Sequence, residues 1–138
     1  MHDDCPFCRI VAGDESAAVL YEDDRTIAFL DQQPAATGHA LVVPRTHAEE
    51  IFTEDSATTD AVFDAVRTVA GALEDALEPD GFSVFHTSGP LVGTVDHAHV
   101  HVVPRTADDD VSLALSRRGF DPDEADRLAS RVRNALET

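Results

Sequence analysis

Three of the seven histidines in this chain lie within five residues, in the run His-Ala-His-Val-His at positions 97–101. Alternate side chains of a β-strand point to opposite faces, so a strand here would place His97, His99 and His101 on one face. Neighbouring imidazoles would then lie about 6.5–7 Å apart, given a rise of about 3.3 Å per residue. A solvated, histidine-rich strand face is one interpretation. We favour a second, in which these imidazoles take part in chemistry.

Histidines spaced in this way have two familiar uses. A His-x-His pair can supply two ligands to zinc, and an imidazole nitrogen can attack an electrophile to form a covalent intermediate. A cupin-like metal site would need a glutamate a few residues after the pair. Residues 102–105 are Val-Val-Pro-Arg and offer none, which disfavours that site.

Cys5 and Cys8 are the only cysteines of the chain. The sequence begins Met-His-Asp-Asp, without the basic and apolar regions of a signal peptide, so we expect a cytoplasmic protein in which a structural disulfide is disfavoured. A thioredoxin-like redox pair needs a βαβ context that the sequence does not indicate. Two thiolates would fill half of a tetrahedral zinc site, and two free cysteines in a small apolar cluster are the alternative.

Residues 97–103 resemble the motif of the histidine triad (HIT) superfamily, in which three histidines alternate with apolar residues and two more apolar residues follow. Residues 29–31 and 38–47 are similar to the N-terminal segment of that family, and residues 5–8 resemble the start of its zinc-carrying bacterial and archaeal branch. The resemblance covers nearly the whole chain. It implies an α+β fold with a five-stranded antiparallel sheet and two main helices, in a homodimer that joins two sheets.

The same resemblance implies a nucleotide hydrolase or transferase that acts at the α-phosphate. His99 would be the nucleophile and would form a nucleotidyl-histidine intermediate that water then cleaves. This chemistry needs a neutral imidazole with one free nitrogen and with its other N–H held by an acceptor. His101 would donate to the phosphate oxygens, and His39 would orient or polarise the triad that includes His97. No cofactor is needed for the chemical step.

A nucleotide site is implied by the resemblance as well. Asp31 would accept hydrogen bonds from the ribose hydroxyls, although a turn residue before Pro34 is the alternative. The positions that would line the base pocket are apolar, and they could equally be plain core. They are Phe7, Ile10, Phe29 and Leu30.

Three positions near the expected phosphate site bear on turnover. Gly93 stands where the family often has Gln, and His86 stands where many members have Asn. Thr94 follows where Ser is common, and its hydroxyl could still donate to the leaving group. These departures put leaving-group preference and rate in doubt, so a nucleotide-binding module without turnover is the second hypothesis. His86 could also be a strand residue without a role, and a zinc hydrolase is a third, distant possibility.

By the family pattern, His47 would be the third zinc ligand beside Cys5 and Cys8, and His97 would be the fourth. A closed set of four ligands would make this zinc structural rather than catalytic. It would tie the N-terminus to the strand that carries the histidines.

The acidic composition limits the partners. The chain has 27 acidic and 10 basic residues, a formal net charge of −17, and no lysine. Such a charge disfavours binding to nucleic acids or anionic membranes, and it opposes a phosphate-bearing substrate such as the small nucleotide that the resemblance implies unless local groups reverse the potential. At about 1 M salt the Debye length falls to about 3 Å, and the long-range repulsion nearly vanishes. We therefore expect a halophilic protein from a salty cytoplasm, with a merely acidic protein as the alternative.

The 138 residues are enough for one domain, which we place at residues 1–138. Alternation and turn residues predict strands at 19–22, 26–30, 38–44 and 81–87, and a histidine strand that ends at Val103 before Pro104. Apolar spacing predicts a helix through residues 62–77, capped by Thr53 or Ser56. A last helix is expected after Asp121, as its cap, with an apolar face formed by Ala125, Leu128, Ala129, Val132 and Leu136. Short strands without regular strand–helix alternation favour an α+β fold.

Overall fold

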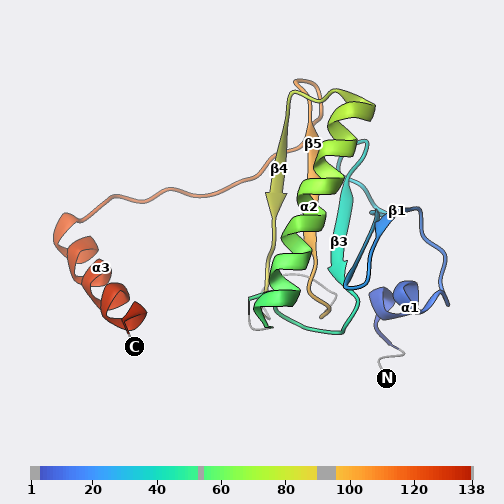
Figure 1. Cartoon of the computed structure of the whole chain (residues 1–138). Coiled ribbons are helices and arrows are strands. Elements are labelled where there is room, and N and C mark those ends of the chain that lie inside the picture. Colours follow the sequence, from blue (N-terminus) through green and yellow to red (C-terminus); the bar gives the residue numbers. More distant parts are fainter. Residues whose placement is uncertain (1–3, 53–54, 90–95, 138) are drawn as a thin grey trace.

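A five-stranded antiparallel sheet in the order β1-β2-β3-β5-β4 forms the centre of the protein (Figure 1). The computed structural model describes residues 4–52, 55–89 and 96–137. Every neighbouring pair of strands is antiparallel, which confirms the expected α+β sheet. The strands are β1 (Val19–Glu22), β2 (Thr26–Leu30), β3 (Ala40–Pro44), β4 (Gly81–Phe85) and β5 (Val100–Arg105).

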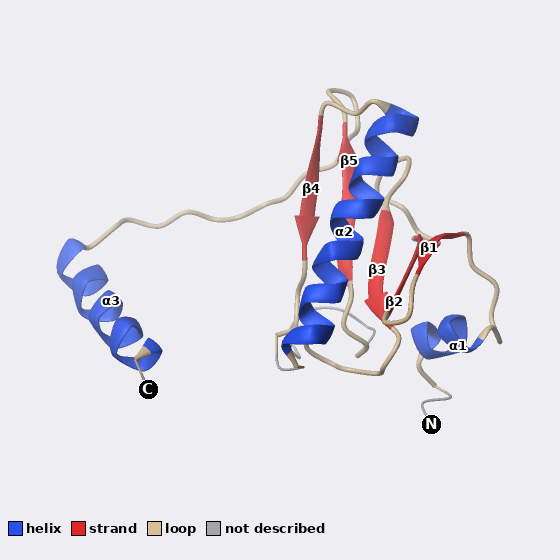
Figure 2. Ribbon diagram, viewed as in Figure 1, coloured by secondary structure: helices blue, strands red, loops and turns tan. Residues whose placement is uncertain are grey.

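Helix α2 (Ser56–Leu77) packs across one face of the sheet and contacts β1, β2, β3 and β5 (Figure 2). Its cap is Asp55, whose carboxylate accepts the Thr58 N–H at 2.8 Å. The expectation of Ser56 as the cap is therefore wrong, since Ser56 is the first helical residue, and Thr53 lies outside the described residues. The helix buries an apolar stripe of Val62, Ala65, Val66, Val69 and Leu73.

The opposite face of the sheet is covered in part by α1 (Pro6–Ala12), a helix that the sequence reasoning did not predict. The Sγ atom of Cys5 caps this helix by accepting the Cys8 N–H at 3.2 Å. Gly13 ends it in the left-handed region, at φ 82°, where glycine is favoured. Alternate residues of a strand point to opposite faces, so the sheet buries apolar residues on both of its faces. On the side of α1, Phe7 and Ile10 of the helix pack with the strand residues Ile27, Phe29, Leu41 and Val43.

The histidine strand differs from the prediction at both ends. β5 begins at Val100, so His97 and His99 precede it and only His101 lies within the strand. The expectation that all three histidines share one strand face is therefore wrong. At its other end β5 continues through Pro104 to Arg105. Proline has no N–H to donate to a neighbouring strand. It is tolerated at position 104 because β5 pairs with β3 only as far as Val102.

Helix α3 (Pro122–Leu136) lies away from the sheet at the end of an extended segment (Figure 1). Asp121 caps it as expected, accepting the N–H groups of Asp123 and Glu124. The helix buries none of its residues, and its apolar residues Leu128, Val132 and Leu136 are exposed. Within the described ranges, no helix is long and apolar enough to cross a membrane.

Candidate active site and metal centre

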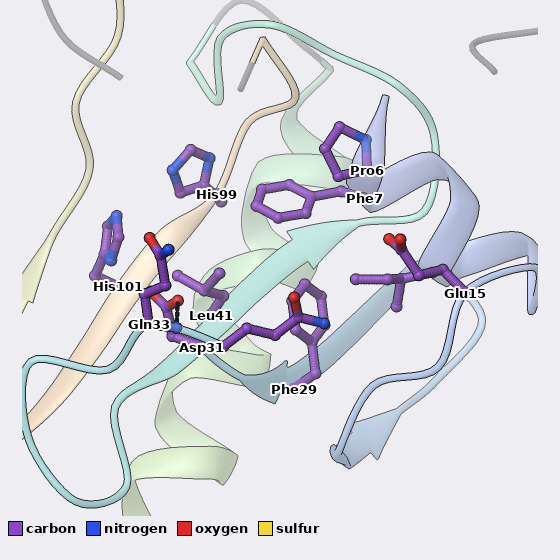
Figure 3. A pocket seen from close by; sticks show the side chains of 11 residues that line it. Pro6, Phe7, Glu15, Phe29, Asp31, Gln33, Leu41, His99 and His101 are labelled. Atoms are coloured by element: carbon purple, nitrogen blue, oxygen red, sulfur yellow. Dashed lines mark hydrogen bonds between the residues drawn. The ribbon is translucent and has the colours of Figure 1, made fainter. Parts of the chain in front are cut away.

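A cavity of about 380 Å³ opens between α1, the end of β2 and the histidine segment (Figure 3). Both apolar and polar side chains line it, which suits a ligand with a flat apolar part and a polar part. Leu30 is not among them, because it follows Phe29 on β2 and so points to the other face of the sheet. The lining residues are Pro6, Phe7, Ile10, Glu15, Phe29, Asp31, Gln32, Gln33, Leu41, His99 and His101.

His99 lines this cavity with a fixed tautomer. Its Nδ1 lies 2.7 Å from the carbonyl oxygen of His97, and a carbonyl can only accept, so Nδ1 carries the proton and donates it. Burial lowers the pKa of His99, against the opposing effect of that same hydrogen bond. At neutral pH the ring is therefore uncharged, with its Nε2 lone pair free to attack.

A hydrogen-bonded chain sets the tautomer of His101. The N–H of Ala35 donates to His39 Nδ1 at 2.9 Å, so a neutral His39 carries its proton on Nε2. That Nε2–H donates to His101 Nδ1, also at 2.9 Å, and leaves the His101 proton on Nε2. Burial, followed by the neighbouring imidazoles of His99 and His39, lowers the pKa of His101 to about 4. His101 is therefore a neutral N–H donor at the cavity.

Asp31 joins this chain at the edge of the cavity. Its Oδ2 lies 3.5 Å from His39 Nε2, and its Oδ1 accepts the Gln33 N–H at 2.9 Å (Figure 3). Asp31, His39 and His101 have a spacing that could hold a metal ion. The tautomer argues against one, because the Ala35 N–H occupies His39 Nδ1 and places a proton on the nitrogen that would have to bind the ion.

Phe85 is a site residue that the sequence reasoning missed. It pairs with His101 across β4 and β5, and the two rings stack with centroids 4.4 Å apart and planes 14° apart. Opposite residues in antiparallel strands are neighbours, so Phe85 could be identified as a site residue only once the register of β4 against β5 was known. Phe85 fixes the plane of the His101 ring.

The N-terminal cysteines and two histidines form a second cluster. Cys8 Sγ lies 3.2 Å from His47 Nδ1, and His97 Nδ1 lies 3.4 Å from Cys5 Sγ and 3.5 Å from Cys8 Sγ. The cysteines do not form a disulfide. The four donor atoms lie within 4.8 Å of one another and can hold a metal ion.

The donor chemistry of this cluster fits a metal. The Nε2–H of His97 donates to the Pro44 carbonyl oxygen at 2.8 Å, so its Nδ1 lone pair is directed at the thiols. Burial and the adjacent Cys5 raise the pKa of the Cys8 thiol to about 11 in the absence of a metal. An ion would displace that proton, since the thiolate is the ligand form. Two thiolates and two imidazoles make a closed tetrahedral set.

His86 is not among the residues that line the cavity. Its Nδ1 lies 2.9 Å from the His99 carbonyl oxygen, and its Nε2 lies 3.2 Å from Glu50 Oε1. The contact with Glu50 was not foreseen, because the two residues belong to different loops. Gly93 and Thr94, the other two expected phosphate-side positions, lie outside the described residues.

Comparison with known proteins places the chain in a family. The sequence model of the HIT domain matches residues 12–108. "Protein hit" of Bacillus subtilis is 33% identical over 97% of this chain and 95% of its own length. An adenylylsulfatase of Arabidopsis thaliana is 32% identical over 99% of this chain and 71% of its own length. An adenosine 5′-monophosphoramidase of Schizosaccharomyces pombe is 33% identical over 73% and 74%, respectively.

Solved structures agree with the sequence matches. A Streptococcus mutans protein is 33% identical, with a TM-score of 0.90 over 97% of this chain and 86% of its own. A zinc-bound histidine triad protein of Mycobacterium smegmatis is 34% identical, with a TM-score of 0.73 over 96% and 95%. With its fold, its histidine motif and these matches, the chain belongs to the HIT domain family.

Proposed function

We propose that the protein is a nucleotide hydrolase or transferase that cleaves at the α-phosphate of a purine nucleotide through a nucleotidyl-histidine intermediate on His99. The observation that carries this proposal is the hydrogen bond from His99 Nδ1 to the His97 carbonyl, which leaves Nε2 unprotonated at the cavity. The adenylylsulfatase and monophosphoramidase activities named for two relatives support a nucleotide hydrolase.

In the first step, His99 Nε2 attacks the α-phosphorus. The new P–N bond forms as the bond to the leaving group breaks, and the leaving group departs with that electron pair. The imidazole becomes cationic, and the His97 carbonyl that accepts its Nδ1–H stabilises the charge. Water then attacks phosphorus and gives up a proton to the departed leaving group or to solvent, the P–N bond breaks, and the ring returns to its neutral tautomer as the nucleoside monophosphate leaves.

His101 has the role of a neutral donor in this mechanism. Its Nε2–H is available for a phosphate oxygen because His39 already donates to its Nδ1. His39 acts through His101 and does not itself line the cavity. The N–H dipole of His101 would present a positive partial charge to the phosphate in a chain whose net charge is −17.

The nucleoside would occupy the rest of the cavity. Asp31 would accept the ribose hydroxyls, which favours a ribonucleotide. Phe7, Ile10 and Phe29 form the apolar end where the base would pack. The edge contact between the rings of Phe7 and His99, at 5.1 Å between centroids, joins the base end to the nucleophile.

We further propose that Cys5, Cys8, His47 and His97 hold a structural zinc ion, supported by the donor set and by the zinc-bound relative. Zinc would supply a rigid crosslink between α1 and the segment before β5. All four ligand positions come from protein side chains, so no step of the reaction uses the ion.

We propose one domain over residues 1–138, in a cytoplasmic and halophilic protein that forms a homodimer. The segment between β5 and α3, together with α3 itself, supports the dimer. Its apolar residues Leu115, Phe120 and Leu136 are 75%, 79% and 79% exposed in one copy. A second copy would give this apolar surface a partner.

Incubation with adenosine 5′-phosphoramidate tests the activity. We expect release of AMP by the wild type and a loss of at least about a thousandfold in the His99→Ala variant. Binding of AMP without release that depends on His99 would favour the nucleotide-binding module instead. Activity that resists a chelator in a protein that stays folded would exclude a zinc hydrolase.

A further inference from the structure

His86 stands between two hydrogen-bond acceptors. Its side chain is 9% exposed and follows the end of β4. The His99 carbonyl oxygen faces Nδ1 at 2.9 Å, and the Glu50 carboxylate faces Nε2 at 3.2 Å. A neutral imidazole has one N–H and would direct a lone pair at one of these oxygens. Only the imidazolium ion satisfies both contacts.

Glu50 is a carboxylate partner for that ion. A hydrogen bond with Ser88, followed by the Phe52 N–H at 3.1 Å and then by His86, holds the pKa of Glu50 below its usual range. The Phe52 ring stands edge-on to His86, with centroids 5.8 Å apart. The His86 side chain is 9% exposed and the Glu50 side chain is 27% exposed, so the contact lies partly out of water, where such a pair is stronger than at a fully exposed surface.

Few charged or titratable groups face His86 in the described residues. Glu50 comes from the loop after β3, His99 precedes β5, and His101 lies within β5. Burial is the largest cause that lowers the pKa of both His99 and His101, and the neighbouring His86 lowers the pKa of each further. Asp31, at the end of β2, acts in the opposite direction on the same two rings.

The backbone of His99 is thus held from two sides. Its ring donates to the His97 carbonyl, and its own carbonyl accepts from His86. We propose that His86, as an imidazolium ion held by Glu50, is a positioning residue that fixes the His99 backbone for attack and adds a positive charge beside the α-phosphate. This inference rests on the proposed function. The proposal assigns a role to His86 at the position where many members of the family have Asn.

The first test measures the wild-type protein directly. Nitrogen NMR of the His86 ring near neutral pH reports whether one or both ring nitrogens carry a proton. We expect two protonated nitrogens, and a chemical shift for His86 that moves in Glu50→Gln. A singly protonated ring in the wild type would overturn the proposal, and this test needs no variant at position 86.

The second test measures kcat and KM for adenosine 5′-phosphoramidate. His86→Asn keeps a donor for the His99 carbonyl but no charge, so we expect a kcat about tenfold lower and an almost unchanged KM. Glu50→Gln removes the carboxylate that holds the His86 ring and should lower kcat in the same way. Glu49→Gln removes a charge from the adjacent exposed residue and should behave as wild type.

The outcomes separate this inference from the proposed function. If His99→Ala is inactive while His86→Asn matches the wild type in kcat and KM, the positioning role is wrong and the hydrolase stands. If His99→Ala retains activity, the hydrolase mechanism itself is wrong.

Discussion

The side chain of His99 donates to the backbone carbonyl of His97, 2.7 Å away, while the side chain of His97 enters the cluster with Cys5 and Cys8. His97 therefore belongs to both the candidate metal site and the candidate active site. Its ring is fully buried, and its carbonyl sets the tautomer of the nucleophile. A substitution that displaces His97 should therefore also weaken the hydrogen bond that fixes the His99 tautomer, and so lower the activity that depends on His99.

The first prediction concerns that link. Cys8→Ser should lower both the zinc content and the melting temperature, because a closed structural site contributes folding free energy. We expect a fall of roughly 10 °C or more, since about 1 kcal/mol shifts the melting temperature of a domain of this size by roughly 2–8 °C. Calorimetry and metal analysis check it. A variant with no zinc and an unchanged melting temperature would refute the structural role.

The second prediction concerns the chain of hydrogen bonds from His39 to His101. His39→Leu removes the donor to His101 Nδ1, so the His101 proton is no longer fixed on Nε2. We expect kcat to fall by about 10- to 100-fold, as for other groups that orient a functional side chain. His39→Gln offers an amide N–H in place of Nε2–H and should retain more activity. Equal losses in the two variants would show that the donor is unimportant.

The third prediction concerns acid stability. Burial and neighbouring imidazoles lower the pKa of His101 from 6.5 to about 4, so the unfolded chain binds this proton more tightly. Stability from His101 is fully present above about pH 6.5 and is lost as the pH falls towards about 4. His101→Phe keeps a ring to stack on Phe85 but cannot titrate. Urea unfolding between these pH values should therefore show a shallower acid loss in the variant, and parallel curves would contradict the assignment.

Much of the fold follows from local patterns. β1 and β2 have the predicted bounds, and Asp121 caps α3, because alternation and capping are short-range signals. Helix α1 was missed because its seven residues are too few for a helical period and because its cap is a thiol. The start of β5 was misplaced because burial of His97 in the cysteine cluster outweighs strand alternation.

The candidate site was only partly predictable for a similar reason. The family pattern supplied His39, His99 and His101, which the structure brings together. The contacts of Glu50 with His86 and of Phe85 with His101 depend on strand register and loop packing, which no spacing in the sequence encodes.

The fourth prediction concerns salt. A net charge of −17 should destabilise the compact state by self-repulsion, and molar KCl should relieve it, because the Debye length there is about 3 Å. We expect the melting temperature to rise steadily from dilute buffer to molar KCl. A protein no more stable in molar KCl than in dilute buffer would refute the halophilic proposal.

The most direct test of the mechanism is to trap the intermediate. Wild-type protein mixed with adenosine 5′-phosphoramidate, quenched rapidly in alkali and digested, should yield a peptide with an adenylyl group on His99 by mass spectrometry. The His99→Ala protein should give neither this adduct nor AMP. Rapid release of AMP with no adduct on His99, together with full activity in the alanine variant, would contradict the account.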